Sequence, residues 1–154
     1  MSVINGEDGN IIAYDNIPLK PKDCKGDEIL KIHYIASVIV NIAKEYKVTH
    51  ISVENSYMGS NSRTAISLSR LYGGVTTLLI ENGFELIYTY VPSTWRKEVT
   101  GVGNKTKEGC YNWLINNLIS KEEFGEFAEK GKDKNDDIVD AILIGYCLYK
   151  KLNN

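Results

Sequence analysis

Short apolar runs alternate along this chain with longer stretches whose apolar residues recur at helical spacing, and this alternation restricts the fold most. Strand-like runs cover residues 2–4, 11–14, 48–54 and 84–91. Helical patterns cover residues 27–46, 62–82, 93–98, 105–119, 121–128 and 135–151. Strands that alternate with helices typically form a sheet covered by helices. The sequence therefore predicts an α/β protein, with the first two strands forming a hairpin around a turn-rich segment.

The composition is typical of one globular domain. The chain has 154 residues, of which 43% are hydrophobic and 25% are charged, so we expect residues 1–154 to form a single domain. In the second helix the inward residues are expected to be Leu68, Leu71, Leu78 and Leu79. No apolar run approaches the roughly 20 residues that cross a bilayer, and the N-terminus does not resemble a secretion signal. We therefore expect a cytoplasmic protein without a membrane partner.

Carboxylates gather where the last predicted helix begins, in the run Asn135-Asp136-Asp137-Ile138-Val139-Asp140-Ala141. The stripe expected to be buried comprises Ala141, Ile144 and Leu148. At about 3.6 residues per turn, Asp137 and Asp140 lie on that same side, whereas Asp136 points elsewhere. Buried carboxylates need a partner, and a divalent cation is one. Acids also cap helices and interact favourably with the helix dipole, so a purely structural role stays open.

A third acid, Glu54, ends the strand-like run Ile51-Ser52-Val53-Glu54. Open α/β sheets bind ligands at the carboxyl ends of their strands, although an exposed strand-end acid is the alternative interpretation. Together with the two acids of the last helix, Glu54 suggests a divalent-cation site, because hard cations prefer carboxylate oxygens. Tyr57, on a polar loop, precedes Arg63 and Arg70; these groups suit bases and phosphates, and a solvated helix face is the alternative for the arginines.

Five sequence blocks follow one another in a characteristic order: Val53-Glu54-Asn55-Ser56-Tyr57-Met58, residues 65–73, Pro92-Ser93-Thr94-Trp95-Arg96, Gly101-Val102-Gly103 with Lys107, and Asp137-Ile138-Val139-Asp140-Ala141. In order and approximate spacing they resemble the RuvC-type Holliday-junction resolvases. The resemblance covers nearly the whole chain from Ser2 onward. It implies an RNase H-like fold with a mixed sheet flanked by helices, a homodimer, and metal-dependent cleavage of four-way DNA junctions in recombination and repair.

The resemblance also implies roles for individual residues. Glu54, Asp137 and Asp140 match metal-binding catalytic positions, which would hold two Mg²⁺ or Mn²⁺ ions. Tyr57 matches the aromatic residue that enters the junction near its crossover, and Lys107 and Arg96 match basic positions near the scissile backbone. The expected DNA contacts are therefore Tyr57, Arg63, Arg70, Arg96, Lys105 and Lys107.

One block of the family has no counterpart in these residues. The family's first strand carries a catalytic aspartate in a pattern like Ile-Gly-Ile-Asp, upstream of the strand that begins here at Ser2. Asp8 and Asp15 are nearby acids, but turn and strand-end positions suit them better. We expect the working protein to carry a short segment before Met1, and an in-frame stop codon directly upstream would contradict this. The alternative functions are a junction-binding protein that does not cut, and another RNase H-like nuclease acting on RNA–DNA hybrids.

Overall fold

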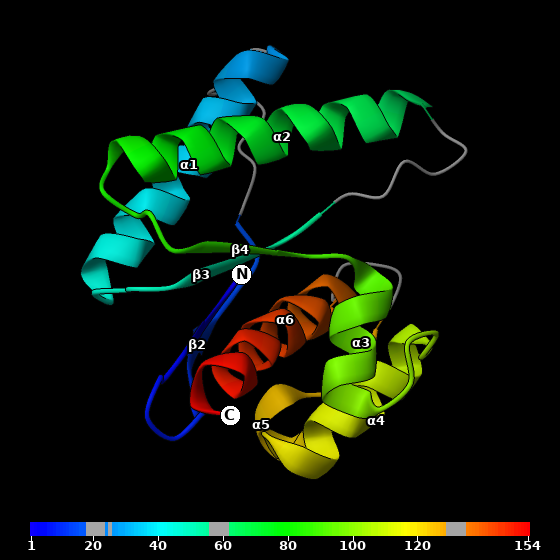
Figure 1. Ribbon diagram of the computed structural model, residues 1–154. Helices are drawn as coiled ribbons and strands as arrows, with labels where there is room; N and C mark the ends of the chain where they lie inside the picture. The colour runs from blue at the N-terminus through cyan, green and yellow to red at the C-terminus, as the bar shows by residue number, and fades with distance from the viewer. Residues whose placement is uncertain (18–23, 25, 56–61, 129–134) are drawn as a thin grey trace. The chain divides into compact units, whose positions relative to one another are not determined.

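The computed structural model describes residues 1–17, 24, 26–55, 62–128 and 135–154 (Figure 1). These residues form two compact units. Unit 1 comprises Met1–Asn16 together with Pro92–Asn154, and unit 2 comprises Ile17–Val91. The expectation of a single domain over residues 1–154 stays a prediction.

The described residues of unit 2 form two helices and a parallel pair of strands. Its elements are α1 (Glu28–Glu45), β3 (Ile51–Glu54), α2 (Ser62–Glu81) and β4 (Ile87–Tyr90). The helix α2 connects β3 to β4, as parallel strands require a long crossover, and the register places Glu54 opposite Tyr90. Its core combines Ala36 and Val40 of α1 with Val75 and Leu79 of α2, against which Ile51 and Ile87 of the strands pack. Burial of these apolar side chains fixes β3, and therefore Glu54, in unit 2.

The prediction that four leucines of α2 point inward is wrong for one of them. Leu79 is fully buried and Leu71 and Leu78 pack against the core, but Leu68 is 44% exposed. The core cluster shared by α1 and α2 extends along α2 only as far as Leu71, one turn later, so Leu68 lies beyond this cluster, although the smaller Ala65 is buried. Periodicity gives the face of a helix, but it does not give the length over which a partner covers that face.

Two adjacent glycines of α2 make a matched test of this packing. A Cβ at Gly74 would clash with Ile32 Cγ2 of α1, whereas a Cβ at Gly73 would meet no atom within 4 Å. Gly74→Ala is therefore expected to lower the free energy of unfolding by about 1–3 kcal/mol through overpacking. Gly73→Ala should raise it by about 0.5–1 kcal/mol, because alanine is the better helix former. Urea unfolding of both variants checks this, and equal effects would contradict the close approach of α1 and α2.

The described residues of unit 1 form a hairpin and four helices. The hairpin strands β1 (Ser2–Ile4) and β2 (Ile11–Tyr14) pair antiparallel, with Val3 opposite Ala13. The helices are α3 (Pro92–Thr100), α4 (Lys107–Asn117), α5 (Lys121–Phe124) and α6 (Asp136–Asn153). α6 packs against β1, α3 and α4, and the Ser2 hydroxyl donates a hydrogen bond of 2.9 Å to the Ala141 carbonyl. The core of unit 1 thus fixes the start of α6, where the acids lie.

The described strands form one antiparallel and one parallel pair, flanked by helices. The predicted α/β class and each predicted helix and strand are confirmed, with differences of a few residues at the ends. In the part of the chain that the structure describes, none of the helices is long and apolar enough to cross a membrane.

Candidate active site at the start of the last helix

The structure corrects which carboxylate of α6 is buried. The Asp136 side chain is fully buried, the Asp140 side chain is 16% exposed, and Asp137 is exposed. The prediction that Asp136 points away from the core is therefore wrong. At about 100° per residue, the buried arc of α6 is centred near Val139 and Leu143, so it includes Asp136 and leaves Asp137 at its edge.

Lys107 contacts the buried Asp136. Its Nζ donates a hydrogen bond to Asp136 Oδ2, and the two groups form an ion pair. This hydrogen bond raises the pKa of the Lys107 ammonium, and the negative charges of Asp136, Asp137 and Asp140 raise it further, against partial burial that lowers it. The ammonium group therefore lies in the field of all three α6 carboxylates.

Arg96 supplies a second cation to the same acids. Its Nη2 lies 3.4 Å from Asp140 Oδ2, and its guanidinium carbon lies 4.9 Å from the ring centre of the buried Trp95. The Arg96 side chain is only 20% exposed, so most of it packs against the protein, with Asp140 and Trp95 among its contacts. Nearby, burial and the charge of Asp140 raise the pKa of the Cys110 thiol, while Arg96 and Lys105 act in the opposite direction.

Unit 1 therefore brings together four of the predicted site residues: Asp137, Asp140, Arg96 and Lys107. Lys105 lies in the segment just before α4. Asp136 joins this group, and the sequence analysis missed its role. A helical wheel centred on the most apolar arc of α6 would have shown that Asp136 lies on the buried face. Its partner Lys107, which is 29 residues away, could not have been found from local spacing.

The remaining predicted residues belong to unit 2. Glu54 is partly buried at the end of β3, where the Asn55 amide donates a 2.8 Å hydrogen bond to the Tyr90 carbonyl. Arg63 is exposed in the first turn of α2, and Tyr57 lies outside the described residues. A joint metal site of Glu54 with Asp137 and Asp140 stays a prediction.

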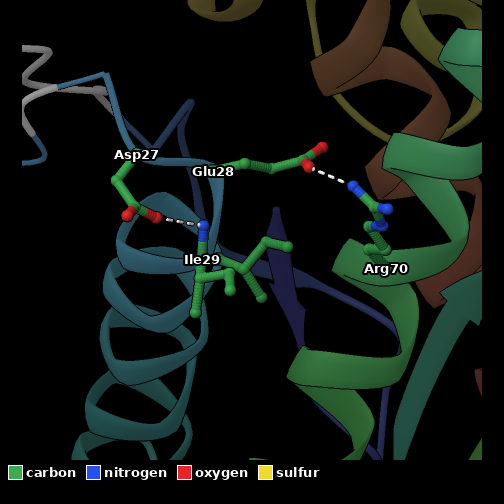
Figure 2. Close-up of a pocket in the computed structure, with 5 residues that line it drawn as sticks. Asp27, Glu28, Ile29 and Arg70 are labelled. Atoms are coloured by element: carbon green, nitrogen blue, oxygen red, sulfur yellow. Dashed lines mark hydrogen bonds and ion pairs between the residues drawn. The ribbon is translucent and has the colours of Figure 1, made fainter.

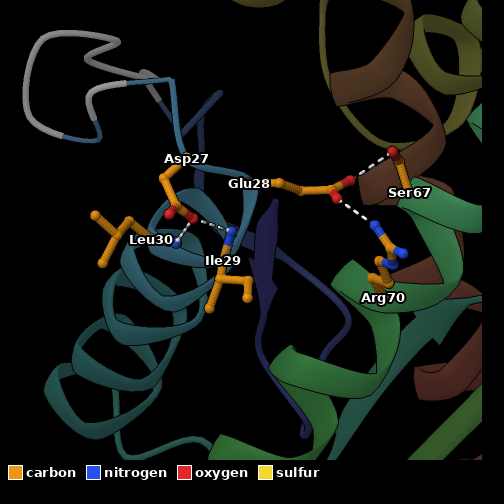
Figure 3. Close-up of polar contacts among 6 residues, drawn as sticks. All are labelled: Asp27, Glu28, Ile29, Leu30, Ser67 and Arg70. Atoms are coloured by element: carbon orange, nitrogen blue, oxygen red, sulfur yellow. Dashed lines mark hydrogen bonds and ion pairs between the residues drawn. The ribbon is translucent and has the colours of Figure 1, made fainter.

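Arg70 takes part in a polar contact between α2 and the start of α1 (Figure 3). Its Nη1 lies 2.6 Å from Glu28 Oε2, and the Ser67 hydroxyl donates a 2.6 Å hydrogen bond to Glu28 Oε1. The bond from Ser67, followed by that from Arg70, lowers the pKa of Glu28. Asp27 caps α1 by accepting hydrogen bonds from the amides of Ile29 and Leu30. The role of Arg70 as a DNA contact stays a prediction.

These side chains also border an open pocket of about 660 Å³ (Figure 2), which is lined by Asp27, Glu28, Ile29, Ile32 and Arg70. Figure 2 shows the Glu28 carboxylate turned toward Arg70 at the edge of this pocket. The pocket therefore lies within unit 2, where the start of α1 meets α2.

The α6 acids suit a hard divalent cation. Within the described residues, no group of three or more His, Cys, Asp or Glu side chains gathers closely enough to hold a metal ion. Asp137 and Asp140, however, are three residues apart on one helix, which makes their side chains neighbours. Two carboxylates with one further oxygen ligand are typical of Mg²⁺ or Mn²⁺ sites. The donor atoms therefore fit the predicted metal, provided that another residue completes the site.

Comparison with known proteins identifies a family whose members resemble this chain over most of its length. A family model described as crossover junction endodeoxyribonuclease RuvC matches residues 2–147. The crossover junction endodeoxyribonuclease RuvC of Ehrlichia canis is 26% identical over 96% of this chain and 86% of its own length. The protein of the same description from Caldicellulosiruptor saccharolyticus is 24% identical over 93% of this chain and 78% of its own length.

Solved structures agree with this result. The Thermus thermophilus RuvC structure matches 99% of this chain and 87% of its own, with a TM-score of 0.71 and 15% identity. T. thermophilus RuvC in complex with Holliday junction substrate matches with a TM-score of 0.73 and 12% identity over the same shares. These two likenesses confirm the predicted RNase H-like fold. The extent of the family match shows that the chain belongs to the crossover junction endodeoxyribonuclease RuvC family.

Proposed function

We propose that this chain is a metal-dependent endonuclease that resolves four-way DNA junctions. The observation that carries the proposal is the cluster at the start of α6, where Lys107 lies in the field of three aspartates and Arg96 contacts one of them, Asp140. Acids that bind metal and cations that attract phosphate are the two components that phosphodiester hydrolysis needs. The relative solved in complex with Holliday junction substrate supports branched DNA as the substrate of this chain.

Asp137 and Asp140, together with Glu54, are the residues that would hold Mg²⁺ or Mn²⁺. When bound, two such ions activate water and stabilise the leaving 3′ oxygen of a phosphodiester. Asp137 is exposed at the start of α6, and the Asp140 carboxylate is already oriented by Arg96. Glu54 is the proposed third ligand because it ends a parallel strand, the usual place for ligand-binding residues in an α/β sheet.

Lys107 and Arg96 would act on the scissile phosphate. A lysine ammonium attracts phosphate as a point charge, whereas an arginine can donate two hydrogen bonds. The Lys107 side chain is 38% exposed while its ammonium contacts Asp136, so Lys107 lies at the surface of unit 1. Arg63, Arg70 and Lys105 are proposed to contact the DNA backbone further from the reaction.

A homodimer is proposed as the working form, acting in the cytoplasm. Large apolar side chains are exposed on the described parts of α1 and α2, and self-association would cover such residues. They are Ile29, Leu30, Ile66, Leu68 and Ile80. Two copies of one active site would also suit the paired cuts that resolve a four-way junction.

The test uses a labelled synthetic four-way junction and a linear duplex of matched sequence, each with Mg²⁺, Mn²⁺ or a chelator. Paired cuts in the junction that need metal would support the proposal. Selective binding without cutting would instead indicate a junction-binding protein that is not catalytic. Equal cutting of an RNA–DNA hybrid would favour another RNase H-like nuclease.

Tyr57→Ala is expected to lower the junction cleavage rate by about tenfold, because one aromatic contact to a base contributes about 1–3 kcal/mol. Binding to the linear duplex should change little, since phosphate contacts supply most of it. Tyr46→Ala is the matched control, because Tyr46 is a partly exposed tyrosine at the end of α1. Cleavage and binding are measured on the same junction, and an unchanged rate in Tyr57→Ala would count against its insertion into the crossover.

A further inference from the structure

We propose that Asp136 is a positioning residue for Lys107, which it holds beside Asp137 and Asp140. The inference rests on the function proposed above, because it concerns how Lys107 is presented to the scissile phosphate. It goes beyond that function because Asp136 is neither a proposed metal ligand nor a proposed DNA contact.

The two members of this ion pair differ in burial. The Asp136 side chain is fully buried, whereas the Lys107 side chain is 38% exposed. A buried carboxylate packed in a helix has few alternative positions, while a lysine at the surface has many. Asp136 therefore acts as the fixed partner, and Lys107 is the partner that it immobilises.

The backbone around Asp136 is itself well anchored. The preceding residue, Asn135, accepts a 2.9 Å hydrogen bond from the Ala128 amide through its side chain and donates one of 2.9 Å to the Glu126 carbonyl. The Asn135 amide also donates to the Ala128 carbonyl at 2.8 Å. These three bonds tie the start of α6 to the segment before it, so the position of the Asp136 carboxylate is set by the fold.

The other end of Lys107 is fixed as well. Lys107 is the first residue of α4, and the Thr106 hydroxyl caps that helix by accepting a 3.0 Å hydrogen bond from the Gly109 amide. A lysine held at its Cα by a capped helix and at its Nζ by a buried acid has lost most of its freedom before substrate binds. Preorganisation of this kind raises the rate of a reaction because the ordering is complete before the chemical step.

Asp136→Asn is the direct test, because asparagine keeps the size of the side chain and removes its charge. The first readout is the exchange of the Lys107 ammonium protons with water, followed by NMR on protein labelled with ¹⁵N-lysine, without metal or DNA. Lys107→Arg identifies the signal. Exchange at Lys107 is expected to be about tenfold faster in Asp136→Asn, because the hydrogen bond to the carboxylate protects these protons. Unchanged exchange would overturn the proposal.

Glu126→Gln is the matched control for this measurement. It removes the partner of Lys121, whose Nζ lies 2.7 Å from Glu126 Oε1 in an exposed ion pair of the same unit. In this variant, exchange should be faster at Lys121 and unchanged at Lys107. Faster exchange at both lysines would indicate a general loosening of unit 1 and would count against a specific anchor.

The second readout is the single-turnover cleavage rate at a saturating concentration of four-way junction. Asp136→Asn should lower this rate by about tenfold and leave the junction Kd unchanged, as expected for an interaction that matters in the transition state. Asp136→Glu, which keeps the charge, should recover part of the rate. Asp136→Ser serves as the second variant if Asp136→Asn does not fold.

The two proposals fail in different ways. Faster Lys107 exchange together with unchanged cleavage would overturn the positioning role, while cutting by the parent chain would still support the proposed function. If the parent chain cuts no junction, the proposed function fails. The exchange measurement then decides about the anchor by itself, because it needs neither metal nor DNA.

Discussion

Asp137→Asn and Asp140→Asn are each expected to lower the rate of junction cleavage by more than about 100-fold, because even residues that only support a metal ligand contribute 10–100-fold. Junction binding should persist or become tighter, since each change removes a negative charge that repels phosphate. Cleavage is measured under single-turnover conditions, and binding is measured in Ca²⁺ or chelator. Binding of Mn²⁺, followed by calorimetry or electron paramagnetic resonance, should weaken in parallel.

Glu122→Gln is the control for these two variants. It removes an exposed acid of α5, outside the acid cluster, and is expected to leave cleavage and metal binding unchanged. If Asp137→Asn lowers only the thermal unfolding midpoint and cleavage persists, the acid caps α6 and has no catalytic role. For Asp140→Asn, a loss of cleavage without any change in metal binding would point to the contact with Arg96 instead.

The secondary structure could be predicted from the sequence because its signals are local. The apolar stripe of α1 gives the helix limits within one residue, since the prediction of 27–46 compares with Glu28–Glu45. The strand predicted at 48–54 is shorter, because Val48 still donates a hydrogen bond to the Ala43 carbonyl at the end of α1. Lys47 also has a positive φ of 52°, which ends the helix and delays the strand.

The arrangement of charges at the site could be predicted only in part. The sequence motif placed Asp137 and Asp140 on one helix, and the family resemblance assigned Lys107 and Arg96 to the same reaction. The burial of Asp136 was missed because helical periodicity shows a repeating face but not which neighbouring elements cover it. The helices α3 and α4, which are distant from α6 in sequence, pack against it. The ion pair of Asp136 with Lys107 depends on the packing of α4 against α6.

The second large effect concerns stability. Lys107→Met is expected to lower the free energy of unfolding by about 2–4 kcal/mol, because it removes the cation beside the fully buried Asp136 carboxylate. The value is at the lower end for a buried ion pair, since the Lys107 side chain is 38% exposed and solvent screens part of the interaction. Asp136→Asn should have a smaller effect, because Lys107 can then turn toward water. Chemical unfolding of the two variants measures this asymmetry.

The double variant Asp136→Asn/Lys107→Met separates a coupled ion pair from two independent effects. If the pair is coupled, the double variant is more stable than Lys107→Met alone, because the buried charge is removed together with its partner. Additive losses would contradict the coupling.

The pH dependence of stability gives an independent check. Since the pKa of Lys107 is raised, the contribution of Lys107 to the free energy of unfolding is complete below the ordinary lysine pKa of about 10.4. This contribution is lost only as pH rises through the higher value in the folded protein. The difference in stability between the parent chain and Lys107→Met should therefore shrink in strongly alkaline solution, where Lys107 loses its charge. A difference that does not change there would mean that Lys107 does not stabilise Asp136 as a cation.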